Sequence, residues 1–476
     1  MKLLTVFACL ATVLAQTIRP TIPSEDDFYN APSNLTSYDA GDIIDFRRAP
    51  NQVRSLFTPL KVENAWQLLV KSQNARGEPI AMVTTVLVPY NADPSKLVSY
   101  QYAQDSATMD CAPSYSLLYR GEIGTFVQQA ETLLVQALLT KGWYVVLPDY
   151  EGPDGAFTSG WQAGYATVDS IRAALSSKSI TGISPNADTA LWGFSGGSFA
   201  STWGASVQPE YAPDLKENLV GAALGGWVTN WTDVIAASDG TTYAGLVPNI
   251  LNGMIKSNPD LKEVFDAEFK EDRRKELYSR TDDCVFTSFI NYLNRDIFGG
   301  DDPWTEKGWD FFKIPEIKEA VLNNSIGVLK DTPRPEIPLF LYHGTPDQIV
   351  PFNGSQKAYE NFCEWGIDSL EFAVSETSGH LLEATVGNGA ALAWLERMLN
   401  GEEPVKGCNR TVRSTNVLYP GADVQLSQVI STIPSSARGS KIGEETPNKT
   451  DSSLITRIFQ QSLGGVLGLI GPIPLR

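Results

Sequence analysis

The sequence predicts an α/β protein with a mostly parallel central sheet, and three observations support this prediction. Short apolar runs typical of buried strands alternate with stretches of helical period along most of the chain. One strand-to-helix junction carries the pentapeptide Gly193-Phe-Ser-Gly-Gly197. Two later apolar runs are each followed by a polar residue of catalytic type, Asp347 and His380. Parallel sheets place their ligand sites beyond the carboxyl ends of the strands, so we expect a site there.

The expected elements follow the chain in order. Residues 65–72 and 79–89 are typical of paired strands with a bend at Gly77-Glu-Pro79. The segment 125–141 has apolar residues at helical spacing, and Gly142 should end that helix. Further strands are expected at 97–103, 143–148, 189–192, 338–343 and 370–374, and further helices at 166–177, 198–205, 243–256, 262–270, 286–293 and 390–399. This alternation requires crossover connections, which favour parallel pairing.

The chain of 476 residues is long enough for one large core with an inserted subdomain. We expect the first part of the core, including an N-terminal surface arm, in 16–227 and the second part in 334–403. The intervening residues 228–333 exceed what strand-helix repeats require and look helical, which predicts an inserted cap. In 404–476 the alternation is lost and Pro, Ser and Gly runs appear, which predicts a C-terminal flap and tail.

The N-terminal residues 1–15 combine one charged side chain, a short apolar core and a small final residue. This pattern predicts a signal peptide cut after Ala15 and an extracellular protein, with a buried N-terminal helix as the alternative. Sequons agree with secretion and are candidate glycosylation sites. They begin at Asn34, Asn230, Asn323, Asn353, Asn409 and Asn448.

Four cysteines remain once the expected signal, which carries Cys9, is removed. An even number in a secreted chain favours two disulfides, with three possible connectivities. The four are Cys111, Cys284, Cys363 and Cys408. No Cys-x-x-Cys pair is present and the chain has 2 histidines, so we expect no metal site and no cofactor.

The formal net charge of −18 disfavours nucleic acid and anionic membranes as partners. The last residues, 463–476, are apolar, but this stretch is short and interrupted by Gly and Pro. It should therefore not insert stably into a membrane. We expect a soluble monomer.

Ser195 is the candidate nucleophile, because a serine on a tight strand-to-helix turn is forced outward between glycines. A glycine-rich turn that merely contains serine is the alternative. The hydroxyl needs a base, and the chain offers His343 and His380. In hydrolases with such a turn the chain order is serine, acid, histidine, which selects Asp347 and His380. We interpret His343 as a structural neighbour, with a role as the base as the alternative.

Several segments resemble motifs of one family. They are 105–115 (Asp-Ser-Ala-Thr-Met-Asp-Cys-Ala-Pro-Ser-Tyr), 149–152 (Asp-Tyr-Glu-Gly), 193–197, 342–347 (Tyr-His-Gly-Thr-Pro-Asp) and 378–380 (Ser-Gly-His). Over nearly the whole mature chain, the sequence resembles the secreted lipases of Candida yeasts, of the Candida antarctica lipase A type. The resemblance implies an α/β-hydrolase fold with a helical cap and a C-terminal flap. It implies hydrolysis of triacylglycerols at an oil–water interface, with acyl transfer to alcohols as a further reaction. It also implies the disulfides Cys111–Cys284 and Cys363–Cys408.

The expected chemistry is acyl transfer through an acyl-serine, in which Ser195 attacks, His380 moves the proton and Asp347 orients His380. The backbone N–H of Gly196 should form one arm of the oxyanion hole. Position and resemblance point to Asp105 for the second arm. A carboxylate would repel an oxyanion, so Asp105 should either be protonated or donate only its amide. A helix cap or turn former is the alternative for Asp105.

Other functions stay open from the sequence. A soluble carboxylesterase would lack interfacial activation, and a serine peptidase of the same fold would need a pocket for peptide termini. A binding protein that has lost its chemistry typically lacks a triad member, whereas all three are present here. The apolar faces of the expected cap are explained by packing against the core or by a lid that meets lipid.

Overall fold

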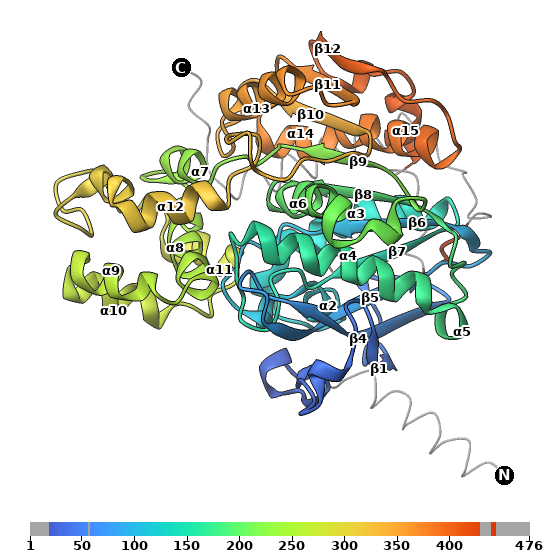
Figure 1. Ribbon diagram of the computed structural model, residues 1–476, viewed down its shortest axis with the longest axis horizontal. Coiled ribbons are helices and arrows are strands. Elements are labelled where there is room, and N and C mark those ends of the chain that lie inside the picture. The colour runs from blue at the N-terminus through green and yellow to red at the C-terminus, as the bar shows by residue number, and fades with distance from the viewer. Residues whose placement is uncertain (1–18, 56–57, 429–438, 444–476) are drawn as a thin grey trace.

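The structure is a computed structural model that describes residues 19–55, 58–428 and 439–443. Within these ranges ten strands form one sheet in the order β1-β4-β5-β7-β6-β8-β9-β10-β11-β12 (Figure 1). The strands are β1 Ile43–Arg48, β4 Asn64–Gln73, β5 Pro79–Val88, β6 Asp93–Gln101, β7 Trp143–Pro148, β8 Asp188–Phe194, β9 Leu219–Gly225, β10 Leu339–Gly344, β11 Ser369–Ser375 and β12 Gly407–Arg413. A separate two-stranded sheet pairs β2 Arg54–Ser55 with β3 Thr58–Pro59.

The strand directions confirm the predicted fold class. From β7 to β12 every neighbouring pair in the large sheet is parallel. The strands β1, β4, β5 and β7 pair antiparallel. The hairpin of β4 and β5 turns at Gly77, whose φ of +78° is in the left-handed region that glycine adopts without strain.

Helices cover both faces of the sheet. They are α2 Pro113–Ser116, α3 Phe126–Thr140, α4 Gly160–Ser176, α5 Lys178–Thr181, α6 Gly196–Tyr211, α13 Phe352–Glu364, α14 His380–Val386 and α15 Asn388–Leu399. On one face α4, α6 and α13 contribute Ile171, Trp203 and Phe362 to a buried cluster. On the other face α3 and α15 contribute Leu138 and Trp394 to a second cluster. Full burial of each such side chain stabilises the fold by about 2 to 3 kcal/mol.

The chain between β9 and β10 forms the helices on the left side of Figure 1. They are α7 Trp231–Ser238, α8 Leu246–Ser257, α9 Leu261–Glu268, α10 Glu271–Ser279, α11 Val285–Asn291 and α12 Pro315–Asn323. Phe265, Phe269 and Phe311 form an aromatic centre for this group, with ring centroids 5.1 to 5.2 Å apart. We call these helices the cap. They occupy the expected segment 228–333, whose boundaries as a domain remain a prediction.

Two disulfides tie distant segments together. Cys111, in the loop after β6, is bonded to Cys284, which directly precedes α11 of the cap, with a Cα–Cα distance of 5.6 Å. Cys363 of α13 is bonded to Cys408 of β12, with a Cα–Cα distance of 6.0 Å. This is the pairing that the family resemblance implies, and the first bond fastens the cap to the loop that follows β6.

Both ends of the described chain contribute more to the sheet than the sequence predicts. The expected N-terminal surface arm includes β1, which pairs with β4 as an edge strand. The expected C-terminal flap begins with β12, which pairs with β11 as the opposite edge. Neither strand has a fully buried residue, so neither has the apolar run that marks an interior strand.

Some predictions fall outside the described residues. These are the signal peptide at 1–15, the apolar end of the tail at 463–476, and the sequon at Asn448. Among the helices of the described part, none combines the length and the apolar character that crossing a bilayer requires.

Candidate active site

Ser195 lies on the turn between β8 and α6 with a backbone φ of +54°. Residues other than glycine rarely adopt this conformation, and here it projects the side chain beyond the carboxyl end of β8. The two motif glycines leave no room for a side chain. A Cβ at Gly193 would lie 2.2 Å from the carbonyl oxygen of Gly197, and a Cβ at Gly197 would lie 2.0 Å from that of Gln101. The tight turn therefore depends on both glycines.

The structure brings Ser195, Asp347 and His380 together. Asp347 follows β10 and His380 follows β11, so both lie beyond the carboxyl ends of the parallel strands, as Ser195 does after β8. His380 Nε2 is 3.0 Å from Ser195 Oγ, and His380 Nδ1 is 2.7 Å from Asp347 Oδ2. The carboxylate is an acceptor only, so Nδ1 carries the hydrogen and Nε2 of the neutral ring accepts from the serine hydroxyl. This is the arrangement in which a serine can lose its proton to a base.

The Asp347 carboxylate is held from several sides. Its Oδ1 accepts backbone N–H bonds from Ile349 at 2.9 Å and Val350 at 2.8 Å. Burial alone would raise the pKa of Asp347, but His380 and His343 together lower it well below its ordinary value. This shift favours the ionised form of the acid beside His380.

His343 lies beside Asp347, not beside Ser195. Its Nε2 is 3.1 Å from Asp347 Oδ2, while His380 holds the position next to the serine hydroxyl. The geometry thus agrees with the interpretation of His343 as a neighbour of the acid and disfavours its alternative role as the base.

Asp105 lies against Gly196, the residue that follows Ser195. Asp105 has a left-handed backbone, φ +50°, and its Oδ1 would lie 2.0 Å from a Cβ placed on Gly196. This oxygen is buried and has no hydrogen-bond partner in the described residues. Burial raises the pKa of Asp105 to about 7, although His380 acts in the lowering direction. Near and below neutral pH the side chain can therefore act as an O–H donor.

The cap braces the loop that carries Asp105, and sequence reasoning missed this. Asn249 of α8, itself buried, donates from Nδ2 to the carbonyl oxygen of Asp105 at 2.8 Å. The backbone N–H of Val285 in α11 donates to Ser106 Oγ at 3.0 Å. No local pattern marks Asn249, because its partner lies 144 positions away.

Four buried carboxyl groups lie in and behind this loop. Burial raises the pKa of Asp105 and Asp149 to about 7, that of Glu131 to about 8, and that of Glu151 well above its ordinary value. Charge repulsion adds to the effect, since Asp105 raises the pKa of both glutamates. Within the described ranges, no group of three or more His, Cys, Asp or Glu side chains is arranged so that it could hold a metal ion.

These groups predict a fold that is most stable in mild acid. Unfolded Asp and Glu ionise near pH 4, whereas the folded chain keeps these protons until about pH 7 to 8. The folded state binds more protons in this window, so stability should fall as pH rises through it. Thermal unfolding midpoints measured between pH 4 and pH 8 should show this decline.

A matched pair of variants attributes the decline to burial. Glu131→Gln removes one titrating group while its amide oxygen can still accept from Tyr100, so the slope of midpoint against pH should become smaller. Glu402→Gln, at an exposed position, should leave the slope unchanged. Equal slopes in all three proteins would contradict the assignment.

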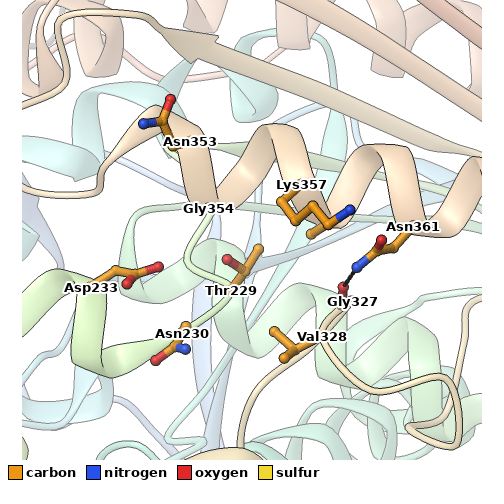
Figure 2. A pocket seen from close by; sticks show the side chains of 10 residues that line it. Thr229, Asn230, Asp233, Gly327, Val328, Asn353, Gly354, Lys357 and Asn361 are labelled. Atoms are coloured by element: carbon orange, nitrogen blue, oxygen red, sulfur yellow. Dashed lines mark hydrogen bonds between the residues drawn. The ribbon is translucent and has the colours of Figure 1, made fainter.

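The sequon asparagines within the described residues differ in how exposed their side chains are. Asn34, Asn323, Asn353 and Asn409 are exposed. Asn230 is half-buried, and its side chain caps α7 by accepting the N–H of Thr232. Asn230 and Asn353 line one hollow of about 350 Å³ between α7, α13 and the loop after α12, seen in Figure 2. None of Ser195, Asp347 and His380 lines this hollow, so it is separate from the site described above.

The fold and the site together define a class. A mostly parallel sheet, a serine on the tight turn after β8, and an acid and a histidine after β10 and β11 are the features of the α/β-hydrolases.

Within that class, the chain belongs to the secretory lipase family, whose profile matches residues 118–407. It is 41% identical to Lipase 1 of Candida albicans over 464 residues, which cover 98% of this chain and 97% of that protein. It is 45% identical to Lipase 5 of the same yeast over 412 residues, covering 86% and 88%. The crystal structure of Candida antarctica lipase A in its closed state matches with a TM-score of 0.75 and 25% identity, covering 90% of this chain and 100% of that chain.

Proposed function

We propose that this protein is an extracellular triacylglycerol lipase that acts as a monomer at the oil–water interface. The observation that carries the proposal is the continuous hydrogen-bond path from Asp347 through His380 to Ser195, at 2.7 and 3.0 Å. The relatives named as lipases support an ester substrate. Two exposed leucines that directly follow His380, Leu381 and Leu382, support contact with an apolar substrate surface.

In the proposed reaction, Ser195 Oγ attacks the ester carbonyl carbon while its proton moves to His380 Nε2. The tetrahedral intermediate collapses, the bond to the alcohol oxygen breaks, and His380 returns the proton to the departing alcohol. Water then attacks the acyl-serine in the same way, so that the fatty acid leaves and Ser195 regains its proton. An alcohol in place of water gives acyl transfer. Asp347 stays ionised and stabilises the imidazolium of His380 in both halves.

Two donors are proposed for the oxyanion that forms on the carbonyl oxygen. Gly196 is the first residue of α6, so its N–H has no acceptor within the helix and lies at the positive end of the helix dipole. Asp105 supplies the second donor as a protonated carboxyl, because its Oδ1 lies against Gly196 and does not point away. Each donor contributes about 3 kcal/mol to lowering the barrier.

Asp105→Asn is expected to keep most of the activity and to extend it toward alkaline pH. With a pKa of about 7, the carboxyl loses its hydrogen as the pH rises, whereas an asparagine NH₂ group donates at every pH. Profiles of kcat/KM on a soluble ester should decline above about pH 7 in the wild type and stay flat in the variant. Asp105→Ala, which lacks a donor, should be impaired throughout. A collapse of the Asn variant at every pH would contradict the role of Asp105.

The exposed sequon asparagines Asn34, Asn323, Asn353 and Asn409 are proposed glycan acceptors, with Asn230 as a more hindered one. Deglycosylation of the secreted protein in ¹⁸O water, followed by peptide mapping, would locate each used site. Absence of label at all of them would contradict this part of the proposal.

Substrate class is tested by the physical state and the chain length of the ester. A lipase should show a disproportionate rise in rate once a triacylglycerol exceeds its solubility, and it should hydrolyse p-nitrophenyl palmitate as well as the acetate. A soluble carboxylesterase should show simple saturation and strong preference for acetate. Saturation without a rise on emulsions would replace the lipase assignment by that of a carboxylesterase. Absence of any ester hydrolysis would contradict both the lipase and the carboxylesterase assignment.

A further inference from the structure

The second histidine of the chain lies under the catalytic acid in a fully buried position. His343 is the penultimate residue of β10, and its side chain has no exposed surface. Its Nε2 is 3.0 Å from the carbonyl oxygen of Val350 and 3.1 Å from Asp347 Oδ2. The same Asp347 oxygen accepts the hydrogen bond from His380 at 2.7 Å. One carboxylate oxygen is thus shared by the only two histidines of the chain.

The hydrogen positions on His343 follow from its partners. A carbonyl and a carboxylate are both acceptors, so Nε2 must carry a hydrogen, which the two oxygens share. Nδ1 is 2.9 Å from Ser355 Oγ of α13, which lies 2.8 Å from the carbonyl oxygen of Trp227. The ring is therefore fixed at both nitrogens and cannot turn its donor away from Asp347.

The contacts also close a loop around the acid. Val350 donates its N–H to Asp347 Oδ1 at 2.8 Å and accepts from His343 Nε2 through its carbonyl oxygen. The turn that carries Asp347 is thus clamped to the end of β10 by one side chain. Loss of that side chain would remove the hydrogen bond to the buried Val350 carbonyl oxygen and would leave Asp347 Oδ2 with His380 as its donor, which is unfavourable.

We propose that His343 is a positioning residue of the reaction, which acts on His380 through Asp347 by donating its Nε2–H to the shared carboxylate oxygen. This inference rests on the proposed triad. Donation from His343 draws part of the negative charge of Asp347 away from His380 and so limits how tightly His380 holds a proton. It also keeps Asp347 Oδ2 aligned with His380 Nδ1, since that oxygen is held from two directions.

Other side chains lie near His343, Asp347 and His380, and they are the same in all variants of position 343. Glu383 of α14 interacts electrostatically with His343 and Asp347, and Asp105 interacts with His380. Phe352 packs edge-on against the His343 ring, with centroids 5.7 Å apart. These residues are the same in every variant of position 343. A difference in pH profile between two such variants is therefore attributed to the hydrogen-bond donor at position 343.

Two variants of His343 separate its donor from its bulk. The side-chain amide of Gln reaches the position of Nε2, whereas that of Asn reaches only the position of Nδ1. His343→Gln should therefore keep the acid limb of kcat/KM near that of the wild type. In His343→Asn the undivided charge of Asp347 should hold the His380 proton more tightly, so the limb should move up by about half a pH unit or more, with kcat lower by about tenfold and KM little changed. If His343 only fills space and donates no hydrogen bond to Asp347, the acid limb of kcat/KM should shift equally in both variants. That result would overturn the inference.

A second measurement does not depend on the variants folding or on activity. With 2 histidines in the chain, selective ¹⁵N-histidine labelling gives resolvable imidazole signals from the intact wild-type protein. His343 should show a protonated, slowly exchanging Nε2 across the active pH range, and an unprotonated Nε2 would overturn the inference. Absence of ester hydrolysis by the wild type would instead remove the proposed function, while this nuclear magnetic resonance result would still stand.

Discussion

Ser195→Ala is expected to lower kcat for ester hydrolysis by a factor of about 10⁵ to 10⁶. The substitution removes the oxygen that forms the acyl intermediate and leaves His380 without a proton to take. KM should change little, because alanine removes one small polar atom from a turn whose backbone is held by glycines on both sides. Activity toward a soluble p-nitrophenyl ester, corrected for the rate of the buffer alone, measures the loss.

Ser206→Ala is the matched control, because this serine is a buried residue further along the same helix, α6. Its activity and its unfolding midpoint should both stay close to those of the wild type. If Ser195→Ala keeps more than a few per cent of the wild-type rate, the nucleophile has been assigned to the wrong residue.

Asp347→Asn is expected to lower kcat by about 10⁴-fold while the protein remains folded. The N–H groups of Ile349 and Val350 both point at Oδ1, so an asparagine must place its carbonyl oxygen there. Its NH₂ group then faces His380 Nδ1, which is itself a donor. His380 must move its hydrogen to Nε2 to avoid this clash, and it can then no longer accept the proton of Ser195.

The control for Asp347→Asn is an aspartate away from the site that also accepts two backbone N–H groups, one on each carboxylate oxygen. Asp239 accepts the N–H groups of Ile297 at 2.7 Å and Phe298 at 2.9 Å within the cap. Asp239→Asn should reduce stability modestly and leave kcat near the wild-type value. A loss in Asp347→Asn no larger than in Asp239→Asn would mean that Asp347 supports the fold and not the chemistry.

Much of the site could be predicted because few residues could fill each role. With two histidines in the chain, the base had two candidates, and the order of serine, acid and histidine along the chain selected His380. The interior strands could also be predicted, since β7 and β10 are buried along their full length and are therefore continuously apolar or aromatic apart from their ends.

The edges of the sheet could not be predicted from the same pattern. In β12 the sequence Gly-Cys-Asn-Arg-Thr-Val-Arg has no fully buried position, so no hydrophobic period separates it from a loop. Its place is set by parallel pairing with β11 and by the Cys363–Cys408 bond. Both are long-range contacts, which a local pattern does not contain.

The polar surroundings of the site were equally hidden. Glu131 and Glu151 look in the sequence like ordinary solvated acids, and only their burial behind the Asp105 loop shows that their pKa values are raised. In the sequence, Asn249 is a polar residue on a mostly apolar helix with nothing to distinguish it. Its role follows only from its hydrogen bond to the Asp105 carbonyl oxygen. Tertiary packing decides which polar groups lose their water, so these features require coordinates.

The most direct test of the central claim is covalent trapping with a p-nitrophenyl alkylphosphonate, followed by peptide mapping. A phosphonate is attacked only by an activated nucleophile, so a relay of Ser195, His380 and Asp347 predicts one adduct per chain, on the peptide that contains Ser195, with release of one p-nitrophenolate. The same reagent should react far more slowly with His380→Ala and at a near-normal rate with Ser206→Ala. An adduct on another residue, or full ester hydrolysis by a protein that the phosphonate leaves unmodified, would contradict the account.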